Sequence, residues 1–244
     1  MRHTRFIILL FVLNWLASAV VFAQDDAQVY PDPERFRADM DTFAAAELAK
    51  PSPLGAIVAT GSSSMRGWHN RIAKDLAPLT IIPRGFGGSN MYDVRYFLDD
   101  LVLRYKPRAV MLYEGDNDAA LGATPAQVLT HFDAIVDAIH QKLPETRIYV
   151  VAVKPSIARW NIWPTMKATN NLLQSRCDEH SLLTYLDVAT PMLGADGKPF
   201  KEIFLPDMLH MKGSGYDIWR DAVRQTLLDA EAGQEHLVNP PIVD

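Results

Sequence analysis

The stretch "LGAIVATGSSSMRGW" at residues 54–68 joins a short apolar run to a glycine and three consecutive serines. The apolar run is too short for an ordinary helix, and its length and flanking glycine are typical of a buried β-strand. Glycine and serine after such a run indicate a tight loop between the strand and a helix. The serines then have two interpretations: they cap that helix, or one of them is an activated nucleophile.

The rest of the chain repeats this alternation of short apolar runs and longer segments with helical periodicity. Such an order predicts an α/β fold with three layers, α/β/α, in which helices cover both faces of a five-stranded parallel sheet. Prolines close the first helix pattern, and the last one begins after a Gly-Ser-Gly sequence. The expected strands lie at residues 55–60, 79–83, 108–115, 147–153 and 182–188, and the expected helices include 30–53, 92–105, 125–143, 165–180 and 213–233.

Residues 1–23 have the composition of a secretory signal peptide. Two arginines precede an apolar run of 17 residues, and small side chains occupy the positions that determine cleavage after Ala23. The sequence therefore predicts a periplasmic or secreted protein, with an uncleaved N-terminal membrane anchor as the alternative. Residues 24–244 suit a single domain, and we expect no stable membrane insertion once the signal is removed.

The composition of residues 24–244 limits the classes of partner that the protein can bind. Without the two arginines of the N-terminal segment it carries 22 basic and 29 acidic residues, which disfavours nucleic acid as a partner. Cys177 is the single cysteine, so an exported chain has no intramolecular disulfide and depends on its core. No pair of histidines has the spacing of metal ligands, so we expect no metal and no cofactor.

Four loops that follow apolar runs carry polar groups suited to acyl transfer. Because the carboxyl ends of parallel strands meet at one edge of the sheet, these loops are expected to lie close together. They hold serine hydroxyls, backbone N–H groups of glycines, an asparagine amide and an Asp-x-x-His sequence. A nucleophile, its base, an orienting carboxylate and oxyanion donors are the parts that this reaction needs. The loops lie at residues 60–68, 83–90, 113–120 and 205–216.

Each of these parts also has a purely structural interpretation. Gly-Phe-Gly-Gly at residues 85–88 suits a turn, and Asn117 suits an Asx turn. The chain contains Asp-x-x-His twice. The copy at residues 137–140 lies in a helix pattern, where this spacing only places both side chains on one face. The copy at residues 207–210 lies in a loop before the last helix, from which a base can project over the edge of the sheet.

Taken in order, the four loops resemble the blocks of the GDSL, or SGNH, hydrolase family over about residues 55–225. Gly61-Ser62-Ser63 is similar to the Gly-Asp-Ser of the family, and Gly115-Asp116-Asn117-Asp118 to its Gly-x-Asn-Asp. Two positions depart from the pattern, because Ser62 replaces the usual Asp and Pro83 stands where the second block often begins with Asn. The resemblance implies five site residues: Ser63, Asp207 and His210 as catalytic residues, and Gly88 and Asn117 as substrate-binding donors to the oxyanion.

The resemblance also implies a fold and an activity. The fold is the flavodoxin-like SGNH-hydrolase fold, with strand order 2-1-3-4-5 and one hydrolase domain over residues 24–244. The activity is that of a serine esterase, which hydrolyses carboxylic esters through an acyl-enzyme and needs no cofactor. Its substrate is a small-molecule ester, such as a short acyl or acetyl ester of a lipid or a carbohydrate.

Two other functions compete with this interpretation. A loop rich in Thr and Ser after the first strand also holds a flavin phosphate in flavodoxin-like proteins. The same fold also supports a ligand-binding protein without catalysis. Four large side chains expected near the same edge either wall a substrate subsite or pack in the core: Trp68, Arg159, Trp160 and Trp163.

Overall fold

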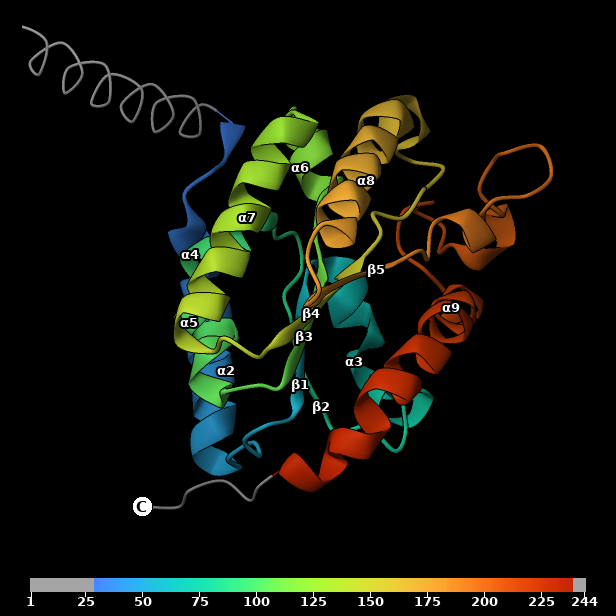
Figure 1. Cartoon of the computed structure of the whole chain (residues 1–244). Coiled ribbons are helices and arrows are strands. Elements are labelled where there is room, and N and C mark those ends of the chain that lie inside the picture. Colours follow the sequence, from blue (N-terminus) through green and yellow to red (C-terminus); the bar gives the residue numbers. More distant parts are fainter. Residues whose placement is uncertain (1–28, 239–244) are drawn as a thin grey trace, which may run out of the picture.

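The computed structural model describes residues 29–238, so the predicted signal peptide lies outside the described residues. A five-stranded parallel sheet crosses the centre of the molecule, in the order β2-β1-β3-β4-β5 (Figure 1). The α/β fold class and this strand order are as predicted from the sequence. The strands are β1 Ile57–Gly61, β2 Ile81–Gly85, β3 Ala109–Tyr113, β4 Arg147–Val151 and β5 Leu183–Leu186.

Helices cover both faces of the sheet (Figure 1). On one face lie α2 Arg37–Ala49, α4 Met91–Tyr96, α5 Leu98–Leu101, α7 Pro125–Lys142 and α8 Trp163–Asp178. On the other face lie α3 Ser63–Asp75 and α9 Gly213–Glu231. The short α6 Asp116–Leu121 follows the carboxyl end of β3. Short segments of 3-10 helix are also present: η1 Pro33–Phe36, η2 Leu103–Tyr105, η3 Trp160–Ile162, η4 Thr190–Met192, η5 Lys201–Ile203 and η6 Ala232–Leu237.

The segment at residues 92–105 differs from the single helix that its pattern predicts. It is divided into α4, α5 and η2, and the chain leaves helical geometry at Phe97 and Val102. Both residues are buried in the core on that side of the sheet. The apolar side chains are spaced as in one helix and reach the core. The backbone nevertheless leaves helical geometry at two positions within the segment.

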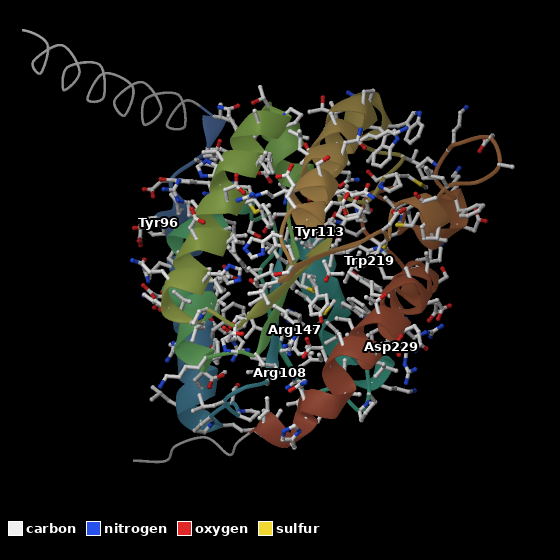
Figure 2. All side chains as sticks on the ribbon, viewed as in Figure 1. Tyr96, Arg108, Tyr113, Arg147, Trp219 and Asp229 are labelled. Carbon is white, nitrogen blue, oxygen red and sulfur yellow. The ribbon has the colours of Figure 1, made fainter. Side chains whose placement is uncertain are left out.

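Side chains from the sheet and its helices form one apolar core on each face. Trp68 of α3 is fully buried beside Trp219 of α9, with their ring centroids 5.7 Å apart. Tyr113 of β3 packs against the same Trp219 at 5.0 Å, and Figure 2 shows this pair between the sheet and α9. Each large apolar side chain buried in this way stabilises the fold by about 1.5–3 kcal/mol. Trp68 therefore belongs to the core and does not wall a substrate subsite.

Charged side chains close the amino end of the sheet. The buried carboxylate of Glu231 accepts hydrogen bonds from Arg108 at 2.9 Å, from Arg147 and from the hydroxyl of Tyr149 at 2.7 Å. Figure 2 shows Arg108 and Arg147 near the carboxyl end of α9. Removal of one partner would leave a buried charge unpaired, so this network of hydrogen bonds ties α9 to the sheet.

Within residues 29–238, no helix combines the length and apolar character needed to cross a membrane.

A buried carboxyl group lies near the other end of the sheet, in α6. The side chain of Asp118 accepts hydrogen bonds from the hydroxyl of Tyr30 and from the backbone N–H of Met91, both at 3.1 Å. Burial raises the pKa of Asp118 from 3.8 to about 7, and these hydrogen bonds only partly oppose that rise. The folded protein therefore holds a proton that the unfolded chain has already lost at the same pH.

This raised pKa predicts how Asp118→Asn changes the stability of the protein with pH. A carboxyl group with a raised pKa contributes its full stability below its unfolded pKa, and this contribution is lost as pH rises through about 7. Asparagine does not titrate, so the melting temperature of the native chain minus that of the variant should fall between pH 4 and pH 8. Thermal unfolding at several pH values measures this difference.

The matched control is Asp137→Asn, at an exposed position of α7. It removes a carboxylate outside the core and measures the effect of the substitution itself on the melting temperature. A constant difference for Asp118→Asn would contradict the raised pKa.

Candidate active site

The carboxyl end of β1 places the three serines. Gly61 has φ +135°, and a Cβ there would lie 2.0 Å from the carbonyl oxygen of Tyr113 in β3, so no other residue fits. The N–H of Ser62 then donates to that carbonyl at 3.2 Å. Ser63 follows as the first residue of α3. The close approach of β1 and β3 therefore fixes where Ser63 stands.

Ser63, His210 and Asp207 form one chain of hydrogen bonds. The distance from His210 Nε2 to Ser63 Oγ is 3.0 Å, and from His210 Nδ1 to Asp207 Oδ2 it is 2.7 Å. The other carboxylate oxygen of Asp207 accepts the backbone N–H groups of Leu209 and His210, both at 3.0 Å. The hydrogen bond to His210, followed by these two, lowers the pKa of Asp207 to about 2. Asp207 is therefore ionised near neutral pH and orients the imidazole.

The loop that carries Asp207 and His210 is tightly folded. The N–H of Leu205 donates to the carbonyl of His210 at 2.7 Å, and the N–H of Met208 donates to the carbonyl of Leu205 at 2.9 Å. Met208 has φ +57°, in the left-handed region that non-glycine residues rarely adopt. The side chains of His210 and Asp207 are 39% and 48% exposed. A molecule from solvent can therefore reach them directly.

Only one of the three serine hydroxyls meets His210. Ser62 is fully buried, and its Oγ lies 3.5 Å from a carboxylate oxygen of Asp116. Ser64 is also buried, and its backbone carbonyl accepts a hydrogen bond from the hydroxyl of Tyr216 at 2.9 Å. Ser62 is the N-cap residue of α3 but makes no side-chain capping hydrogen bond. Capping therefore does not explain the serine run.

Backbone and side-chain donors surround the same edge. Asn117 of α6 donates from Nδ2 to the carbonyl of Ser89 at 2.7 Å, which ties the third loop to the second. Gly88 has φ +90°, and a Cβ there would have no atom within 4 Å, so the loop is open on that side. Within residues 29–238, the N–H groups of Ser63 and Gly88 donate to no other residue. Both remain available to an added acceptor.

Three charged side chains lie near Asn117: Asp116 and Lys154, which had no assigned role from the sequence, and Arg159, which was a candidate for a substrate subsite or the core. Arg159 donates from Nη2 to Asn117 Oδ1 at 2.8 Å, and its Nη1 lies 3.1 Å from a carboxylate oxygen of Asp116. The buried ammonium of Lys154 lies 3.9 Å from the same oxygen and donates to the carbonyl of Leu209 at 2.9 Å. Arg159 and Lys154 contact residues of other loops, and such contacts leave no local pattern in the sequence. The sequence shows only that two cations follow β4.

The other candidates from the sequence lie elsewhere. Asp137 is exposed on α7, and His140 Nε2 lies 2.9 Å from the carbonyl of Thr146, at the amino end of β4. This Asp-x-x-His is therefore far from the carboxyl edge. The rings of Trp160 and Trp163 stack on each other with centroids 5.9 Å apart, and both are half-buried beside Arg159.

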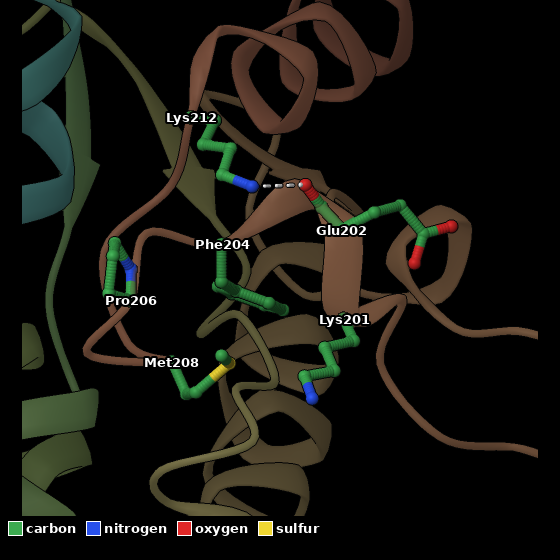
Figure 3. A pocket seen from close by; sticks show the side chains of 6 residues that line it. All are labelled: Lys201, Glu202, Phe204, Pro206, Met208 and Lys212. Atoms are coloured by element: carbon green, nitrogen blue, oxygen red, sulfur yellow. Dashed lines mark hydrogen bonds between the residues drawn. The ribbon is translucent and has the colours of Figure 1, made fainter.

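A cavity of about 460 Å³ lies against the loop that carries Asp207 (Figure 3). Pro206 and Met208, which flank Asp207, form one side of it, and the buried ring of Phe204 lies between them and Lys201. Lys212 donates from its ammonium to the backbone carbonyl of Glu202 at 3.2 Å. A molecule bound in this cavity contacts the loop of Asp207 and His210.

The arrangement has the groups required for nucleophilic acyl transfer. A hydroxyl lies within hydrogen-bond distance of an imidazole, which is oriented by an ionised carboxylate. Free N–H donors stand on the loops beside that hydroxyl. No group of three or more His, Cys, Asp or Glu side chains in the described part of the chain is placed to hold a metal ion.

The doubly wound sheet with this set of groups at its carboxyl edge is that of an α/β/α hydrolase. The sequence model of the GDSL-like Lipase/Acylhydrolase family matches residues 54–218, which is more than half of the chain. The chain therefore belongs to this family of acylhydrolases, and the resemblance seen in the sequence is confirmed.

Known proteins share both sequence and fold with the chain. Platelet-activating factor acetylhydrolase IB subunit alpha1 of Bos taurus is 26% identical over 164 residues, which are 66% of this chain and 69% of the relative. A GDSL-like lipase from Bacteroides thetaiotaomicron superposes with a TM-score of 0.69 at 17% identity, over 79% of this chain and 98% of the other. A catalytic mutant of an acetylxylan esterase from Geobacillus stearothermophilus gives 0.57 at 11% identity, over 70% and 94%. At these low identities, the likeness to the two solved structures shows a shared fold alone.

The two Asp-x-x-His sequences provide a matched test. Asp207→Asn removes the charge that orients His210, so we expect ester hydrolysis to fall by about two to four orders of magnitude. Asp137→Asn removes the same charge on the exposed face of α7 and should change hydrolysis by less than about twofold. Initial rates with a chromogenic acetate ester measure both. Equal losses would show that the wrong pair was chosen.

Proposed function

We propose that this protein is a serine esterase that hydrolyses short acyl esters through an acyl-enzyme. The observation that carries the proposal is the hydrogen-bonded chain from Ser63 Oγ to His210 and on to Asp207. Membership of the acylhydrolase family supports it independently. The signal-like sequence at residues 1–23 supports a periplasmic or secreted location for the esterase.

The proposed reaction begins with attack of Ser63 Oγ on the ester carbonyl. His210 Nε2 accepts the proton of the hydroxyl as the new C–O bond forms, and Asp207 stabilises the resulting imidazolium. The tetrahedral intermediate collapses, and the alcohol leaves with the proton of His210. Water then attacks the acyl-enzyme with His210 as base, so that the carboxylic acid and the free serine are released.

Three donors would stabilise the negative oxygen of the intermediate: the N–H groups of Ser63 and Gly88 and the amide of Asn117. Ser63 is the first residue of α3, where helix N–H groups point outward and favour negative charge. The amide of Asn117 uses one hydrogen for Ser89, which leaves the second for substrate. Each such donor contributes about 2.7–4 kcal/mol to the lowering of the barrier.

The preference for short acyl groups rests on two observations. The side chains of His210 and Asp207 are 39% and 48% exposed, so an ester reaches them from solvent and its acyl chain is not enclosed over them. The names of two similar proteins, an acetylhydrolase and an acetylxylan esterase, describe enzymes that act on acetyl groups. A short acyl group on a variable alcohol fits both.

Ser63→Ala tests the nucleophile. The hydroxyl of Ser63 has His210 as its partner, so the variant should fold normally and lose several orders of magnitude in turnover. A phosphonylating or sulfonylating ester should label Ser63 in the native chain, and His210→Ala should suppress this labelling. Peptide mapping and initial rates give the two readouts.

Ser64→Ala is the matched control, one residue further along α3, and should remain active and be labelled. An adduct on Ser62 or Ser64 would move the nucleophile by one residue. Normal hydrolysis by Ser63→Ala would refute the proposal that Ser63 is the nucleophile, whereas a native chain that hydrolyses no ester would favour a binding function.

The acyl preference is tested with a series of p-nitrophenyl esters from acetate to dodecanoate. We expect kcat/KM to be highest for acetate to butyrate and to fall by about tenfold or more at eight carbons, because the site around His210 is open and leaves a longer chain partly in solvent. A marked preference for the long esters would contradict the proposal on chain length and leave the hydrolysis itself intact.

A further inference from the structure

We propose that Arg159 is a positioning residue for the reaction, which fixes the amide of Asn117 in the orientation that donates to the oxyanion. The inference rests on the proposed function and adds a role for a residue outside the four family blocks. Arg159 lies in the loop after β4, 42 positions from its partner in sequence, and contacts neither Ser63 nor His210 among the described residues.

The chemistry of the guanidinium determines how Asn117 is turned. Arginine only donates hydrogen bonds, so the atom 2.8 Å from Arg159 Nη2 must be the amide oxygen of Asn117. The nitrogen then faces the opposite way, where the carbonyl of Ser89 accepts one of its hydrogens at 2.7 Å. Arginine on one side and a carbonyl on the other therefore select the same one of two amide orientations.

The selected orientation is the one that the proposed reaction needs. With the oxygen held by Arg159, the second hydrogen of Nδ2 is available to a substrate oxygen. If the amide turned by 180° about its last side-chain torsion, its oxygen would face the site and repel a developing oxyanion. The loss of Arg159 would also leave the amide oxygen without its donor. Arg159 thus affects the transition state through Asn117.

A second contact fixes Arg159 itself. Its Nη1 lies 3.1 Å from the buried carboxylate of Asp116, the residue before Asn117, and forms an ion pair there but no hydrogen bond. The guanidinium therefore donates one hydrogen bond to Asn117 while its charge is attracted to the neighbouring residue of α6. The Arg159 side chain is 18% exposed, and its backbone N–H donates to the hydroxyl of Ser156 at 3.3 Å.

The same carboxylate is linked to the loop of His210. The ammonium of Lys154, which is 1% exposed, lies 3.9 Å from Asp116 and donates to the carbonyl of Leu209 at 2.9 Å. Leu209 directly precedes His210. One carboxylate oxygen of Asp116 therefore has two cations near it: Arg159, which donates to Asn117, and Lys154, which donates to the residue before His210. Arg159 is the cation that contacts the donor side chain, which makes it the sharper test.

The test is a double-mutant cycle of Arg159→Met and Asn117→Ala, measured by kcat and KM with an acetate ester. If Arg159 acts through Asn117, Arg159→Met should lower kcat by about tenfold to a hundredfold and change KM by less than about threefold. In the Asn117→Ala background the same substitution should cost less than about threefold more, because the side chain that Arg159 orients is already gone.

Two further variants keep the test decisive. Arg159→Lys keeps a positive charge beside Asp116 and should fold even if Arg159→Met does not, and it should recover part of kcat, since an ammonium group also only donates hydrogen bonds but is carried on a shorter side chain. Arg176→Met removes an arginine that pairs with Asp133 between α8 and α7 at the surface, and it should leave kcat and KM unchanged. Thermal unfolding monitors the folding of every variant.

Several outcomes would overturn the inference. Losses that multiply in the double variant, or a loss that appears mainly in KM, would mean that Arg159 contacts the substrate or acts elsewhere. A native kcat for Arg159→Met would also refute it, provided that Ser63→Ala is inactive and the esterase proposal stands. Normal hydrolysis by Ser63→Ala would instead refute the proposed function, and the two failures are thus distinguishable.

Discussion

The approach of β1 to β3 at their carboxyl ends is the constraint on which the site depends. A Cβ on Gly61 would overlap the carbonyl of Tyr113, so the two strands meet at this point only because residue 61 lacks a side chain. The next N–H then bonds to the same carbonyl, and α3 begins one residue later. The serine at the start of α3 and the asparagine at the start of α6 thereby come to the same edge, where the order of strands reverses.

This chain has a serine at position 62, where the family usually has an aspartate, and the neighbouring Asp116 explains the difference. Ser62 Oγ is buried 3.5 Å from the carboxylate of Asp116. An aspartate at position 62 would place a second carboxylate against the first in a site closed to water, where like charges strongly oppose each other. Asp116 supplies the negative charge of this region from α6, and Arg159 and Lys154 compensate it. A neutral serine at position 62 is therefore compatible with the buried carboxylate at position 116, whereas a second carboxylate would be repelled by it.

The sequence was sufficient for the sheet and for the order of the loops. Each strand is a short apolar run between turn residues, and parallel strands have their carboxyl ends on one side, so the loops that hold Ser63, Asn117 and His210 had to converge. The break at Phe97 could not be foreseen, because the apolar pattern continues across it. The contact of Arg159 with Asn117 was equally hidden, since 42 intervening residues give it no periodic signal. Trp68 near the serines indicated a subsite or a core residue, and only packing against Trp219 decided for the core.

The two ends of the sheet use buried charge in opposite ways. At the amino end the carboxylate of Glu231 accepts hydrogen bonds from Arg108, Arg147 and Tyr149, and these contacts tie α9 to the sheet (Figure 2). At the carboxyl end the cations near Asp116 hold neighbouring loops, and within residues 29–238 the N–H groups of Ser63 and Gly88 have no acceptor. Gly88 is exposed and Ser63 is half-buried, so water can satisfy these groups until a ligand displaces it. The paired charges at the amino end fix the strands whose opposite ends hold the loops of Ser63, Asn117 and His210 together.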